Sequence, residues 1–181
     1  MNAGKLWNYT YLIMSTLIKL YKFSTLRYNS PKISTTNKDK NMQASINLIK
    51  EFVTPVTVAT YCPIQDTYYI GYNQTLNVYN GLSWTEAQVE ADLKQQVNLI
   101  HMLLDAYFIG VIEDNHKVAL ISLIHDIGPE IFMKSELPRH LRNRNYILAS
   151  NAFLNFNKVA RVISITKTAR RLKEQNIFNT K

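Results

Sequence analysis

The side chains best suited to metal binding or nucleophilic catalysis are four histidines and one cysteine in a chain of 181 residues. The histidines are His101, His116, His125 and His140, and they show none of the close spacings typical of metal ligands. Asp126 directly follows His125 and can orient its imidazole, but a metal-dependent pair of this kind needs a second His and Asp upstream. Cys62 has no thiol partner, which excludes an internal disulfide and favours a structural thiol. The sequence also lacks a glycine-rich phosphate loop and a G-x-S-x-G nucleophile elbow, so we predict no metal and no cofactor.

The elements that position these residues follow from the hydrophobic pattern. Apolar residues at helical spacing predict a short helix over 44–52, and the Val-, Thr- and Tyr-rich stretch 53–75 predicts two or three antiparallel strands. Ser83, with Glu86 three residues later, predicts the N-cap of a helix that runs to about residue 104. Further helices are expected at 114–127, 135–143, 145–157 and 164–177. The predicted fold class is therefore α+β, with a small antiparallel sheet followed by a mostly helical body.

Short motifs follow one another in a recognisable order over residues 42–178. They are Lys50-Glu51-Phe52-Val53-Thr54, Tyr61-Cys62-Pro63, Tyr69-Ile70-Gly71-Tyr72-Asn73-Gln74-Thr75, Trp84-Thr85-Glu86-Ala87-Gln88, the stretch from Ala119 to Gly128, the stretch from Phe153 to Lys158, and a final helix from Ile163 to Glu174. In this order the motifs resemble those of the phage-type lysozymes, glycoside hydrolases that cleave the glycan strands of peptidoglycan. The resemblance implies a lysozyme-like fold.

Three positions depart from the pattern of that family. The family's general-acid Glu corresponds to Val53, its second carboxylate to Pro63, and the Thr that places the attacking water to Tyr69. Glycoside hydrolysis needs a proton donor and a second carboxylate, so these departures predict a degenerate muramidase that is not an enzyme. The alternative is a relocated pair of carboxylates, Glu51 and Asp66, in an active muramidase.

The net charge of +8 is distributed in three zones, with net charges of +7 over 1–50, −8 over 51–138 and +9 over 139–181. No carboxylate occurs between Met1 and Lys38, a composition typical of a mitochondrial presequence. A secretory signal and a structural arm are the alternatives. We expect a basic N-terminal extension over 1–41 ending in a polar linker, a lysozyme-like domain over 42–178 and a tail over 179–181. No run is long and apolar enough for a conventional membrane-spanning helix.

The basic zones predict contacts with an acidic partner. The residues expected to make them are Lys5, Lys19, Lys22, Arg139, Arg142, Arg144, Arg170 and Arg171. Acidic protein subunits, an anionic cardiolipin-like lipid and RNA all suit such a surface. The predicted function is an inactive accessory subunit of a respiratory-chain or ATP synthase complex, associated with the mitochondrial inner membrane, with no small-molecule substrate. An RNA-contacting accessory protein of the mitochondrial ribosome is the first alternative, and an active peptidoglycan muramidase is the second.

Overall fold

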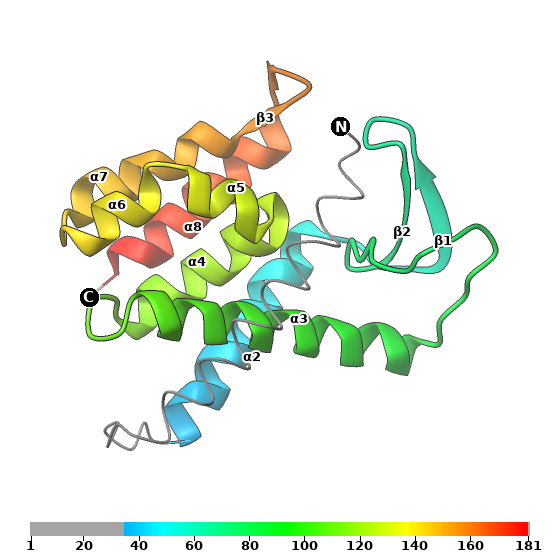
Figure 1. Ribbon diagram of the computed structural model, residues 1–181, viewed down its shortest axis with the longest axis horizontal. Coiled ribbons are helices and arrows are strands. Elements are labelled where there is room, and N and C mark those ends of the chain that lie inside the picture. Colours follow the sequence, from blue (N-terminus) through cyan, green and yellow to red (C-terminus); the bar gives the residue numbers. More distant parts are fainter. Residues whose placement is uncertain (1–34, 181) are drawn as a thin grey trace. The chain divides into compact units, whose positions relative to one another are not determined.

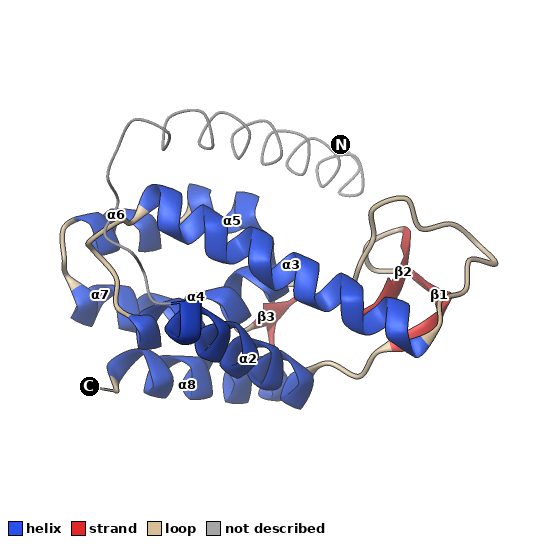
Figure 2. Cartoon of the chain, turned by 90° about the horizontal axis from the view of Figure 1, so that it is seen from below, coloured by secondary structure: helices blue, strands red, loops and turns tan. Residues whose placement is uncertain are grey.

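The computed structural model describes residues 35–180, in which the chain divides into two compact units. The described part of one unit is residues 53–96, and that of the other is residues 35–52 together with 97–180. The first unit contains strands β1 and β2, and the second consists mostly of helices (Figure 1, Figure 2). The predicted α+β class is confirmed.

Strands β1, Val56–Cys62, and β2, Thr67–Gly71, form an antiparallel pair. The pairing is irregular. Val56 pairs with Gly71 and Thr60 pairs with Tyr69, so four steps along β1 match only two steps along β2. The extra backbone of β1 bonds elsewhere: the Ala59 N–H donates to the Leu82 carbonyl at 2.8 Å, and the Thr57 carbonyl accepts from the Trp84 N–H at 2.8 Å. The β-bulge is thus stabilised by the segment that leads into the next helix.

A tight turn follows β2 and depends on two residues with left-handed backbone. Gly71 has φ +61° and Asn73 has φ +67°, a region that Gly and Asn tolerate better than most residues. The backbones of Ile70 and Gln74 exchange two hydrogen bonds of 2.9 Å across the turn. The Gln74 side chain donates to Asp92 Oδ1 at 3.1 Å, which ties the turn to the helix that follows.

Replacing Gly71 with alanine should destabilise the protein. The left-handed backbone costs a residue with a Cβ about 1–2 kcal/mol, and the new Cβ would lie 3.3 Å from Trp84 Cζ3. Gly81→Ala is the matched control, because Gly81 has φ +86° but nothing within 4 Å of the added Cβ. Urea denaturation should show a larger loss in the free energy of unfolding for Gly71→Ala than for Gly81→Ala. Equal losses would mean that the Trp84 contact costs nothing.

The second unit is built around one central helix. Helix α4, Asp114–Ile127, packs against α2, Thr35–Phe52, and against α8, Ile165–Asn179. Its residues from Val118 to His125 are all buried, as expected of a helix surrounded by others. The remaining elements are α3, Glu86–Tyr107, which begins in the first unit, α5, Pro129–Lys134, α6, Leu137–Arg142, α7, Tyr146–Asn151, η1, Ala152–Phe156, and the short strands β3, Lys158–Val159, and β4, Val162–Ile163.

Several predicted boundaries differ from the observed ones. Helix α2 begins at Thr35, inside the stretch expected to be a polar linker. The capping box of α3 is formed by Thr85 and Gln88 instead of Ser83 and Glu86: the Thr85 N–H donates to Gln88 Oε1 at 2.8 Å, and the Gln88 N–H to Thr85 Oγ1 at 3.3 Å. In the part of the chain that the structure describes, no helix combines the length and the apolar character required to cross a bilayer.

Candidate active site

Glu51 is an accessible carboxylate on a firmly held helix end. It lies in the last turn of α2, and its side chain is 48% exposed. One carboxylate oxygen, Oε2, forms an ion pair with Lys173 Nζ of α8. The next residue, Phe52, lies under the Arg170 guanidinium, with 5.8 Å between the Arg170 Cζ and the ring centroid. Two side chains of α8 therefore fix the end of α2 while Glu51 stays open to solvent.

Asp66 is the second carboxylate of the relocated pair considered above, and it lies in the loop of the β1–β2 hairpin. The loop consists of residues 63–66, and Asp66 has left-handed backbone with φ +50°. The Tyr61 hydroxyl donates to Asp66 Oδ1 at 2.7 Å, and this hydrogen bond to a carboxylate raises the pKa of Tyr61. This contact was not predicted. Cys62 pairs with Thr67, and the loop of four residues between them brings positions 61 and 66 to the same end of the hairpin.

The three positions expected to have lost catalytic groups lie in or beside β1 and β2. Val53 is half-buried and precedes β1, whereas Pro63 is exposed and follows the other end of that strand. Tyr69 is half-buried in β2, opposite Thr60. Strand β1 therefore separates Val53 from Pro63, and its bulge lies between Val56 and Thr60.

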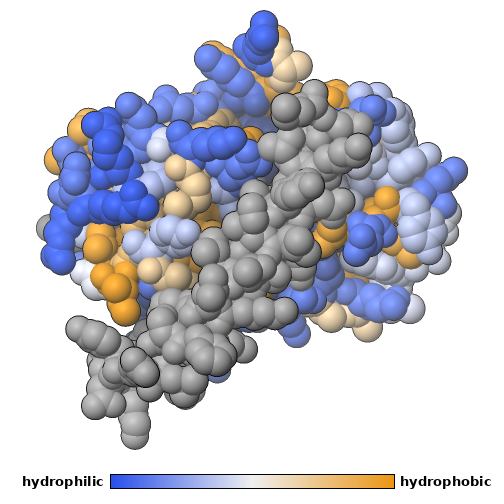
Figure 3. Space-filling model, viewed as in Figure 1, coloured by the Kyte–Doolittle hydropathy of each residue, from blue (hydrophilic) through white to orange (hydrophobic). Residues whose placement is uncertain are grey.

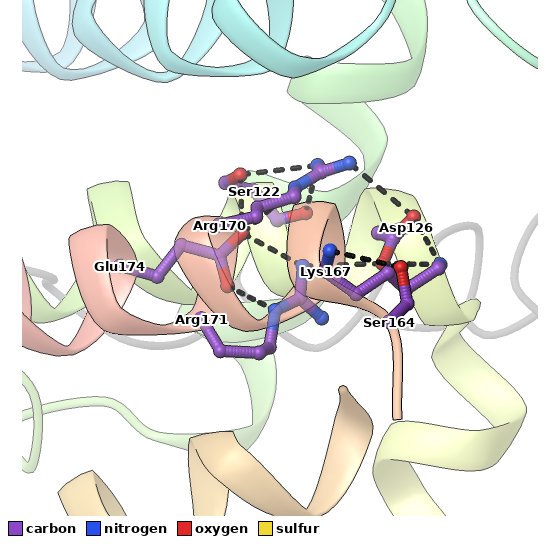
Figure 4. Close-up of polar contacts among 7 residues, drawn as sticks. All are labelled: Ser122, Asp126, Ser164, Lys167, Arg170, Arg171 and Glu174. Atoms are coloured by element: carbon purple, nitrogen blue, oxygen red, sulfur yellow. Dashed lines mark hydrogen bonds and ion pairs between the residues drawn. The ribbon is translucent and has the colours of Figure 1, made fainter. Parts of the chain in front are cut away.

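A buried network of charges joins α4 to α8 (Figure 4). At its centre is Glu174, whose side chain is 0% exposed. Glu174 Oε1 accepts from Ser122 Oγ at 2.6 Å and from Arg170 Nε at 3.0 Å. Its Oε2 forms an ion pair with Arg171 Nε at 2.8 Å. Burial raises the pKa of Glu174, although the two guanidinium groups and the hydrogen bonds act in the opposite direction.

Asp126 is the second carboxylate of this network. Its Oδ2 lies 2.8 Å from Lys167 Nζ and 3.1 Å from an Arg171 guanidinium nitrogen, and its Oδ1 lies 3.3 Å from Arg170. Burial opposes the ionisation of Asp126, but the three neighbouring cations outweigh it and lower the pKa of this carboxyl. Asp126 therefore pairs with the cations of α8, and the ion pairs of the network connect α4 to α8.

The predicted surface contacts of Arg170 and Arg171 are wrong. Their side chains are 4% and 0% exposed and belong to the network, so neither can reach a partner. Arg139, Arg142 and Arg144 are exposed, in a region over α6 and α7 where strongly hydrophilic side chains gather (Figure 3). Lys5, Lys19 and Lys22 lie outside the described residues.

Two of the four histidines make clear packing or polar contacts within the fold. His101 Nδ1 contacts Asp105 Oδ2 at 3.0 Å, and His116 packs between the rings of Tyr146 and Phe178, with centroids 4.8 Å and 4.3 Å away. Over residues 35–180 no group of three His, Cys, Asp or Glu side chains is arranged to hold a metal ion.

Comparison with known proteins gives one consistent family. The phage lysozyme family model matches residues 51–174. The endolysin of Lactococcus phage c2 is 34% identical over 91 residues, which is 49% of this chain and 40% of that protein. The endolysin of Acyrthosiphon pisum secondary endosymbiont phage 1 is 30% identical over 89 residues, which is 49% of this chain and 61% of that protein. The chain thus covers less than two thirds of the length of these curated relatives.

Solved structures show the same fold. The muramidase domain of SpmX from Asticaccaulis excentricus has a TM-score of 0.68 and 24% identity, with 77% of this chain and 97% of that chain covered. The active form of the P1 phage endolysin Lyz has a TM-score of 0.64 and 16% identity, with 92% of each chain covered. The predicted lysozyme-like fold and the resemblance to phage-type lysozymes are confirmed.

These comparisons contradict the predicted function. The curated relatives are phage endolysins, so the prediction of an accessory subunit in a mitochondrial inner-membrane complex is wrong, and so are its location and its partner subunits. The prediction of a chain that is not an enzyme and has no substrate is contradicted by the same relatives. The error came from taking three departures from the family pattern, at Val53, Pro63 and Tyr69, as proof of lost activity.

Proposed function

Since the chain belongs to the phage lysozyme family, we propose that it is an active muramidase that cleaves glycan strands of bacterial peptidoglycan. The observation that carries this proposal is the family match over residues 51–174, which begins at Glu51 and spans most of both units. The names of the curated relatives, all endolysins, support it. The natural site of action is then the bacterial cell wall.

We assign the role of proton donor to Glu51. Cleavage of a glycosidic bond requires a carboxylic acid that can protonate the leaving oxygen. Glu51 is exposed, and Oε1 makes no hydrogen bond or ion pair to the described residues, so this oxygen is accessible to a substrate. The ion pair of Oε2 with Lys173 holds the ionised carboxylate in place at the end of α2. Uptake of a proton from solvent converts Glu51 to the carboxylic acid that the reaction requires.

The full chain should release new reducing ends from purified peptidoglycan sacculi. Cleavage of a glycan strand creates one reducing sugar per bond, whereas cleavage of a peptide or amide bond creates an amino group. We therefore expect reducing ends to accumulate with time and enzyme concentration while free amino groups stay at the level of a buffer control. Accumulation of amino groups, or of neither product, would contradict the proposed function.

A further inference from the structure

The β1–β2 hairpin carries a pair of tyrosines on one face. Tyr61 and Tyr68 are direct cross-strand partners, and their ring centroids lie 5.3 Å apart with the planes tilted by 57°. Tyr61 is 48% exposed, and Ile64, in the adjacent loop, is 71% exposed. Over this part of the molecule the surface in Figure 3 has many of the pale tones of weakly polar residues. The hairpin thus offers a small aromatic surface to solvent.

A hydrogen-bond acceptor lies at the edge of these rings. Asp66 Oδ1 accepts from the Tyr61 hydroxyl at 2.7 Å, and Oδ2 has no hydrogen-bond or ion-pair partner among the described residues. The same hydrogen bond holds the carboxylate beside the Tyr61 ring. An exposed carboxylate next to an aromatic face can accept a hydrogen bond from a ligand that lies on the rings.

The charge of this unit limits the class of ligand. Residues 53–96 contain four carboxylates, Asp66, Glu86, Glu90 and Asp92, against one lysine, Lys94, a net charge of −3. A surface with this charge repels nucleic acid, anionic lipid and other polyanions. It accepts a neutral ligand that presents C–H groups to the rings and N–H or O–H groups to the acceptor.

We propose that Tyr61, Tyr68 and Asp66 bind one neutral N-acetylhexosamine ring of the glycan strand. The C–H face of a pyranose ring suits the negative face of an aromatic side chain, and the N-acetyl amide donates to Asp66 Oδ2. A ring with a free lactyl carboxylate, as in N-acetylmuramic acid, is disfavoured by the charge of Asp66. This inference rests on the proposed function for the choice of ligand, and it assigns these residues to substrate binding and not to proton transfer.

Titration of the full-length Glu51→Gln protein with tri-N-acetylchitotriose, followed by NMR, tests the proposal without turnover of the ligand. Tyr61→Ala in this background should weaken binding about three- to tenfold, the scale of one lost aromatic contact. Asp66→Asn should weaken it about tenfold, through the loss of a charged hydrogen bond. Tyr79→Ala is the matched control, since Tyr79 is 62% exposed in the same unit but lies outside the hairpin. It should bind as tightly as the parent.

Selectivity gives an independent check. N-acetylglucosamine should bind more tightly than N-acetylmuramic acid, and Asp66→Asn should narrow that difference. No binding by the parent, unchanged affinity in both hairpin variants, or equal weakening by Tyr79→Ala would overturn the proposal. So would an unchanged KM on peptidoglycan for Tyr61→Ala. If the hairpin variants lose affinity but the wild-type chain releases no reducing ends, the sugar site stands and the proposed hydrolysis fails.

Discussion

Glu51→Gln is expected to lower the rate of peptidoglycan hydrolysis by about 10²–10⁴-fold, the contribution of a positioned general acid. The substitution keeps the size and shape of the side chain but removes the proton that must reach the leaving oxygen. Reducing-end release from sacculi, measured at matched enzyme concentrations, gives the ratio of the two rates. The change should appear in kcat, because the lost interaction belongs to the transition state.

A loss of stability would not explain this result. Glu51 and Lys173 are 48% and 47% exposed, and an exposed ion pair contributes only about 0–1 kcal/mol. Glu136→Gln is the matched control: it removes a carboxylate that is 71% exposed and pairs with Arg139 at 3.1 Å. Its hydrolysis rate should equal that of the wild type. Comparable rates for Glu51→Gln and Glu136→Gln would show that Glu51 is not the proton donor.

The sequence predicted the elements whose pattern is local. Helix α4 was expected at 114–127 and is observed at those residues, because a long apolar pattern followed by Gly128 marks both its identity and its end. The start of α3 was placed two residues early. Ser83 and Thr85 can both act as N-caps, and only the observed hydrogen bonds between Thr85 and Gln88 decide between them.

Features that depend on distant residues were not predictable in the same way. The charged residues of α8 suggested a solvated basic face, since a helix pattern does not reveal which buried carboxylates another helix will supply. Asp126 of α4 and Glu174 together neutralise Arg170 and Arg171. The ion pairs of Asp126 with the two arginines join residues more than 40 positions apart in the sequence. The bulge of β1 is equally non-local, because the segment 82–84 supplies its hydrogen-bond partners.

The buried network makes the second large prediction, a loss of about 3–5 kcal/mol in the free energy of unfolding for Arg171→Leu. Arg171 and Glu174 are each 0% exposed, so the substitution leaves a buried carboxylate with one guanidinium in place of two. Asp126 also loses a partner at 3.1 Å. Urea denaturation measures the change. Since domains of this kind are stable by about 5–15 kcal/mol, the loss removes a large part of the total stability, and at the low end of that range part of the population unfolds without denaturant.

The same substitution at an exposed ion pair separates burial from charge. Arg139 and Glu136 are 63% and 71% exposed and, like Arg171 and Glu174, are three residues apart, so Arg139→Leu should cost only about 0–1 kcal/mol. Replacing both members of the buried pair, Arg171→Leu with Glu174→Leu, removes the uncompensated carboxylate along with its partner. This double variant should be more stable than Arg171→Leu alone, because the penalty arises from the charge left behind. If the double variant is instead the least stable of the three, the ion pair itself, and not the cost of an unpaired buried charge, holds α8 against α4.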